Sequence, residues 1–158
     1  MFGAILATIS SAATAVVTAV KTLGPAVANF AAKVAPTVTA MMDKIPGLLS
    51  KVSNIASTFL GLTNIFQPGE KVEDMGEASL QAASDGITPD KFNNFDEYMD
   101  SLRNYKTDPE IAKERSSLEK TVAGMAIGTV GLEEKYNANP GDFKDIWLEV
   151  DPEIWTGA

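Results

Sequence analysis

Apolar side chains recur at alternating spacings of four and three residues between residues 27 and 66. A period of 3.5 residues aligns such side chains along one side of a helix. We call this line of side chains the seam and expect it to be an interface with other helices. Its members are Val27, Ala31, Val34, Val38, Met41, Ile45, Leu48, Val52, Ile55, Phe59, Leu62 and Phe66.

Prolines divide the region that carries the seam. Pro36 and Pro46 lie inside it, where a proline removes one helical hydrogen bond and clashes with the preceding turn. The sequence therefore predicts short helices near residues 25–35, 37–44 and 47–66 that share one apolar side.

Helical signals continue through the rest of the chain. Thr88-Pro89-Asp90 and Asp108-Pro109-Glu110 have the residue types that begin helices, and apolar side chains follow each at helical spacing. We expect helices over residues 70–83 and 89–105, a helix from 109 onward, and a last helix from Asn139-Pro140. That last helix would carry Phe143, Ile146, Trp147 and Val150 on one face. Alternating strand patterns are weak throughout, so the predicted fold class is all-α.

Charge divides the chain into two predicted domains. Residues 1–66 hold four lysines and one aspartate, a net charge of +3, whereas the whole chain carries −8, which leaves −11 for residues 67–158. The composition changes most sharply at Gln67-Pro68-Gly69-Glu70. We therefore predict an apolar helical segment over 1–66, which assembles or acts on membranes, and an acidic helical domain over 67–158.

Composition removes several classes of function. Cysteine and histidine are absent, so the chain has no thiolate metal site and no Ser-His-Asp arrangement. An acidic balance without clustered Lys or Arg argues against direct recognition of nucleic acid. Pairs of acids are predicted to lie on solvated helix faces: Glu73-Asp74, Asp96-Glu97, Glu133-Glu134, and Asp142 with Asp145. The sequence therefore predicts no enzyme, no cofactor and no metal.

Three glycines lie in the apolar run from Val122 to Leu132. Gly124 and Gly128 have GxxxG spacing, and Gly131 follows. The run is too short to span a bilayer. Two interpretations stay open: these glycines allow the backbone to pack closely against another helix, or the helix loosens and ends here.

The first twenty residues, Met1–Val20, contain no charge. As a helix they would span about 30 Å, the thickness of the hydrocarbon core of a bilayer. Five hydroxyl side chains interrupt this apolar surface, which favours a helix buried in an oligomer: Thr8, Ser10, Ser11, Thr14 and Thr18. Insertion into a membrane at some stage remains the alternative.

The stretch SAATAVVTAVKTLGPAVANFAAKVAPTV, rich in Ala, Val and Thr with spaced prolines, resembles the apolar segments of bacteriophage tape-measure and internal ejection proteins. The resemblance covers residues 1–66 and is one of composition. It implies a virion component, located in a tail or portal channel, that helps the genome pass a membrane.

We therefore expect a non-enzymatic structural component of a virion or injection machine. It would form homo-oligomers or join other subunits through its apolar N-terminal helices. The alternative is a membrane-inserting pore or secreted effector whose residues 1–66 enter a bilayer, including a host membrane on delivery.

Overall fold

The computed structural model describes residues 16–24, 27–32, 34–35 and 47–137, without the side chains of Leu48 and Leu49. Every regular element in these ranges is a helix, which confirms the all-α fold class. The predicted helices over 37–44 and from Asn139 lie outside the described residues. So do seam members Val38, Met41 and Ile45.

Two helices, α4 (Val72–Ser84) and α7 (Ser117–Lys135), form the centre of the molecule. Their backbones approach closely where glycines replace larger residues. A Cβ at Gly124 would lie 2.0 Å from the carbonyl O of Val72, and one at Gly76 would lie 1.9 Å from that of Lys120. Because only a residue without a side chain fits at such points, the two glycines set how closely α4 and α7 pack.

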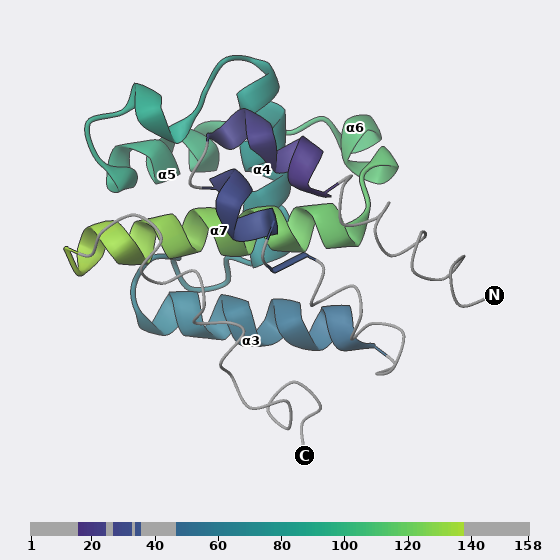
Figure 1. The fold of residues 1–158 in the computed structure, drawn as a ribbon, viewed down its shortest axis with the longest axis horizontal. Helices are drawn as coiled ribbons and strands as arrows, with labels where there is room; N and C mark the ends of the chain where they lie inside the picture. The colour runs from purple at the N-terminus through teal and green to yellow at the C-terminus, as the bar shows by residue number, and fades with distance from the viewer. Residues whose placement is uncertain (1–15, 25–26, 33, 36–46, 138–158) are drawn as a thin grey trace.

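Helix α3 (Leu48–Leu62) lies alongside α7, and the two helices run in the same direction (Figure 1). Gly47 precedes α3 with a positive φ of 69°, a conformation that glycine adopts without strain. Lys135 near the end of α7 donates a hydrogen bond to the carbonyl O of Thr63, just after α3. The C-terminal ends of the two helices are therefore neighbours.

The predicted helix over 89–105 is two elements in the structure. A 3₁₀ turn, η2 (Pro89–Lys91), is followed by α5 (Phe95–Asn104). Asn94 separates them, because its side-chain oxygen accepts a hydrogen bond from the N–H of Glu97 at 2.9 Å and caps α5.

A second break separates α6 (Pro109–Glu114) from α7. Asp108 caps α6 by accepting from the N–H of Glu110 at 2.9 Å. Ser116 then accepts from the N–H of Glu119 at 3.1 Å, which is the capping-box pattern and starts a new helix. Helix α7 continues unbroken through Gly124, Gly128 and Gly131.

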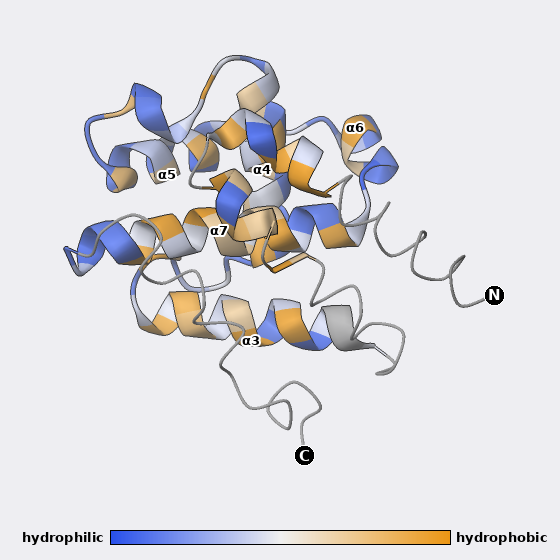
Figure 2. Cartoon of the chain, in the orientation of Figure 1, coloured by the Kyte–Doolittle hydropathy of each residue, from blue (hydrophilic) through white to orange (hydrophobic). Residues whose placement is uncertain are grey.

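One apolar core includes side chains from both predicted domains. Its members come from residues 16–35, 52–66, 72–82, 95–102 and 118–132, and the short 3₁₀ turn η1 (Lys21–Leu23) packs on α4. The predicted boundary at residue 67 lies in the α3–α4 connection. Figure 2 shows hydrophilic residues concentrated on α5, α6 and the ends of α7, and hydrophobic ones along α3.

Candidate interface on helix α3

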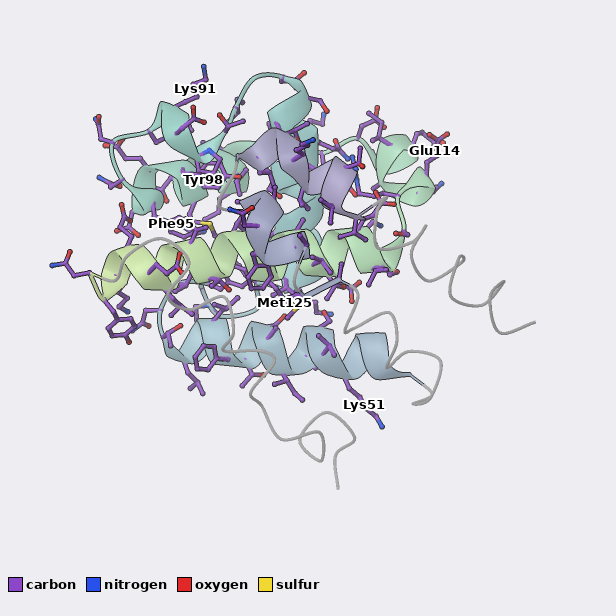
Figure 3. All side chains as sticks on the ribbon, viewed as in Figure 1. Lys51, Lys91, Phe95, Tyr98, Glu114 and Met125 are labelled. Atoms are coloured by element: carbon purple, nitrogen blue, oxygen red, sulfur yellow. The ribbon has the colours of Figure 1, made fainter. Side chains whose placement is uncertain are left out.

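Helix α3 buries one side and leaves another open. Val52, Ala56 and Leu60 recur every four residues and are at most 2% exposed, because this side faces α4 and α7. We define the outer face of α3 as the opposite surface. Its residues are Asn54, Ile55, Thr58, Phe59 and Leu62. Figure 3 shows side chains projecting from α3 away from α7, with Lys51 near the start of the helix.

The outer face forms a shallow hollow of about 330 Å³ that is lined mainly by apolar atoms. Ile55 and Phe59 are half-buried and pack against the edge of the core, whereas Leu62 is 78% exposed. The other large apolar residues that are exposed within the described part are Ile111, at 46%, and Tyr136, at 56%. Leu62 is therefore the most exposed large apolar side chain described.

The structure divides the predicted seam into covered and open parts. The chain's own helices cover Val27, Ala31, Val34, Val52 and Phe66, each at most 2% exposed. These five are not available to a partner in this structure. Leu48 begins α3, but its side chain lies outside the description. What the seam presents at the surface is the row Ile55, Phe59 and Leu62.

The predicted packing glycines lie along one side of α7 and contact three different elements. A Cβ at Gly128 would lie 2.5 Å from Leu60 of α3, and one at Gly131 would lie 2.5 Å from the ring of Phe95 on α5. Gly124 faces Val72 of α4. The three positions thus bring α3, α4 and α5 against one helix, and the sequence did not single out Gly76, the partner glycine on α4.

Helix α3 also differs in charge from the four α-helices that follow it. Lys51 is its one charged residue, whereas α4, α5, α6 and α7 each carry at least two acidic residues. Because the outer face carries no charge and is lined mainly by apolar atoms, covering it with another molecule desolvates few polar groups.

Two arginines connect the elements around this core. Arg103 of α5 donates to Glu70 from Nε at 2.7 Å and from Nη2 at 3.0 Å. Partial burial raises the pKa of Glu70, but hydrogen bonds from Arg103 and the Gln67 N–H, and the Arg103 charge, outweigh it, so the net pKa is lowered. Arg115 donates to the buried Glu77 of α4 at 2.8 Å. Both pairs stabilise the fold.

The acidic pairs that the sequence predicted to be solvated lie in different environments. Glu73-Asp74 and Asp96-Glu97 lie in first turns of helices, and Asp142 with Asp145 lies outside the described residues. Glu133 is buried, contrary to the solvated position expected of it, whereas Glu134 is exposed and accepts from the N–H of Phe95 at 2.8 Å. Within the described ranges, no three acidic side chains are grouped as metal ligands would be.

A second hollow, of about 530 Å³, adjoins the outer face and was not foreseen from the sequence. Residues of α3 and of the loop that follows line it, including Ser57, Asn64, Gln67 and Glu70. Ser57 accepts from the N–H of Val72 at 2.9 Å, so its hydroxyl holds the start of α4. The loop positions come from the α3–α4 turn, which residue spacing alone does not define.

The chain was compared with protein families, curated proteins and solved structures. No protein-family model, no curated protein and no solved structure matches the chain. Among the described residues, no helix has both the length and the apolar character needed to cross a bilayer.

Proposed function

We propose that the protein is a non-enzymatic structural subunit of a virion or injection machine, and that it assembles through the outer face of α3. The resemblance of residues 1–66 to phage tape-measure and ejection proteins supports the class of particle. The exposure of Leu62 beside the half-buried Ile55 and Phe59 supports the surface and carries the proposal. The partners are further copies of the chain or neighbouring subunits.

The free energy gained by burying the outer face in an interface decides whether this face can hold two subunits together. Burying a leucine side chain contributes about 1.5–3 kcal/mol. In a twofold interface the same contact occurs twice, so Leu62 alone contributes several kcal/mol, and each 1.4 kcal/mol is about tenfold in affinity. Ile55 and Phe59 add area at the same place. A weak or moderate contact, repeated across many copies, fits a subunit of a large particle.

Paired substitutions test the surface. Leu62→Glu places a charge on the outer face, and Ile111→Glu makes the same change at the other large aliphatic residue that is exposed in the described part of the chain, on α6. Because both positions are exposed, both variants should fold. Light scattering over a concentration series should show that Leu62→Glu weakens association by at least about tenfold, whereas Ile111→Glu associates as the wild type does. Equal association of all three proteins would contradict the proposal.

Membrane insertion is the second candidate, because Met1–Val20 contains no charged residue. Flotation of the full chain with anionic vesicles is the test. Recovery of the protein in the lipid fraction, at low and at high salt, would favour insertion over surface adsorption. Absence from the lipid fraction under both conditions would remove this candidate and leave the assembly proposal in place.

A further inference from the structure

The outer face of α3 holds both a projection and a recess. Leu62 projects at one end of the face and is 78% exposed. A shallow hollow of about 330 Å³, whose lining includes Ile55, Thr58 and Phe59, lies next to it on the same face. A twofold interface uses one patch on both subunits, so that patch has to supply both shapes. The outer face of one copy can therefore receive the outer face of another.

Charge favours contact between copies at this helix. Each chain carries a net charge of −8, so two copies repel each other wherever their acidic surfaces meet. This repulsion acts over a Debye length of about 8 Å at physiological salt. Helices α4, α5, α6 and α7 each carry at least two acidic residues, whereas α3 carries none. Among these five helices, α3 is the one through which the chain meets itself without opposing carboxylates.

Lys51, the one charged residue of α3, favours an antiparallel pair. Figure 3 shows its side chain pointing away from the core near the start of the helix. In a parallel pair the two copies of Lys51 would face each other, and like ends of the two helix dipoles would meet. In an antiparallel pair each Lys51 lies beside the last turn of the other helix, which has no basic residue and whose carbonyl groups carry partial negative charge. Lys135 at that end is accompanied by Glu134, which lines the same hollow.

An antiparallel pair also covers the whole exposed row. When the row from Ile55 to Leu62 lies on its own copy, Ile55 of one chain falls beside Leu62 of the other. The middle of the row lies between Thr58 and Phe59, so each of these residues meets its own counterpart near the twofold axis. At 1.5 Å per residue, the two copies of Thr58 are about 1.5 Å apart along the helix direction, whereas those of Asn54 are about 14 Å apart.

We infer that the outer face of α3 binds a second copy of this chain in antiparallel orientation, about a twofold axis beside Thr58 and Phe59. The inference rests on the proposed function, because it names the partner at the same surface. One helix face from each copy makes a small interface, so the pair should be weak. A twofold contact closes at two copies, and the pair is then the unit from which other surfaces build a larger assembly.

Single cysteines test this geometry, because the chain has none of its own. Thr58→Cys and Asn54→Cys are a matched pair, since both residues are polar, exposed and one turn apart on the outer face. A disulfide requires Cα atoms within about 7 Å of each other. Under mild oxidation of the full chain, Thr58→Cys should form a dimer of twice 16.8 kDa, and Asn54→Cys should form at least about fivefold less of it. Equal yields from the two variants, or no dimer from either, overturn the inference.

Mixing variants of opposite charge tests whether Thr58 meets its own counterpart. Thr58→Glu and Thr58→Lys should each associate more weakly than the wild type, because each places two like charges together at the axis. An equal mixture of the two should associate about two- to fivefold more tightly than either variant alone, as measured by light scattering. A mixture that associates no more tightly than the separate variants contradicts a twofold contact at Thr58.

The pairing and the proposed function fail in different ways. If Leu62→Glu weakens association but Thr58→Cys yields no more dimer than Asn54→Cys, assembly through the outer face holds and the antiparallel pair is wrong. If Thr58→Cys gives the expected dimer but no species larger than two copies forms at any concentration, the pair holds and assembly of many copies fails.

Discussion

The Tyr98 hydroxyl is fully buried and has no hydrogen-bond partner among the described residues. The ring packs against Phe92 at 5.7 Å and Phe95 at 6.0 Å between centroids, and burial raises the pKa of the hydroxyl above its usual 10.0. A polar group buried without a partner costs about 1–3 kcal/mol. The ring is therefore a stabilising part of the core and the hydroxyl is not.

Removing that hydroxyl should stabilise the protein. We expect Tyr98→Phe to raise the free energy of unfolding by about 1 kcal/mol, measured by urea denaturation. Tyr136→Phe is the control, since Tyr136 is 56% exposed and its substitution should change stability by less than about 0.5 kcal/mol. Destabilisation by Tyr98→Phe would show that the hydroxyl has a partner.

Arg115 neutralises a carboxylate that the core cannot solvate. Glu77 is 6% exposed at its side chain and accepts from Arg115 and, at 2.7 Å, from Gln81. We expect Arg115→Met to lower the free energy of unfolding by about 3 kcal/mol, because it leaves a buried charge with one hydrogen bond. Lys113→Met breaks the exposed pair with Glu110 and should cost less than about 0.5 kcal/mol. Similar urea midpoints for the two variants would contradict this account.

At the scale of elements, the α4–α7 contact depends on having no side chain at Gly124. A Cβ there meets the backbone of Val72, which cannot move aside as a side chain does. We expect Gly124→Ala to lower the free energy of unfolding by about 3 kcal/mol. Gly61→Ala is the matched control: nothing lies within 4 Å of its Cβ, and alanine favours the helix, so stability should rise by about 0.5 kcal/mol. Equal effects in urea denaturation would refute the close packing.

The connection between the α3–α4 loop and α5 should depend on pH. The folded pKa of Glu70 lies below its usual 4.5, so the stabilisation by Arg103 is complete above that value and is lost as the pH falls through the folded pKa. We expect wild type to exceed Glu70→Gln in urea midpoint at about pH 7, and the difference to shrink as the pH falls below 4.5. Glu110→Gln, in an exposed pair, should show a difference near zero throughout this pH range. A Glu70 difference that is constant with pH would exclude this ion pair as its source.

The helical class could be predicted from the spacing of apolar residues, but which side of α3 is covered could not. A spacing of 3.5 residues approximates the 3.6 of a straight helix. At 100° per residue, the ten residues from Val52 to Leu62 leave the two side chains about 80° apart around the helix. Val52 therefore faces the core with Ala56 and Leu60, whereas Leu62 turns to the surface.

Helix breaks were missed for a local reason. Asn94 and Ser116 interrupt runs that keep helical apolar spacing, and their capping bonds form only within a particular backbone turn. The glycine positions on α7 were identified from GxxxG spacing, but their contacts with Val72, Leu60 and Phe95 come from three other elements. Periodicity along one helix does not specify which neighbours meet it.

At the scale of the whole molecule, the chain combines a core that covers most of the described seam with one open apolar face. Residues 16–35 and α3 join the same core as α4 and α7, so the charge division along the sequence does not separate two cores within the described residues. The exposed part of the seam, Ile55, Phe59 and Leu62, is thus accessible to another molecule.

Sedimentation equilibrium of the full chain over a wide concentration range tests assembly through the outer face of α3 most directly. The account predicts a mass that rises above 16.8 kDa toward a multiple of it as the concentration increases, and that rises only at higher concentration for Leu62→Glu. A mass of 16.8 kDa at every concentration for the wild type, or the same rise for Leu62→Glu as for the wild type, would contradict assembly through the outer face of α3.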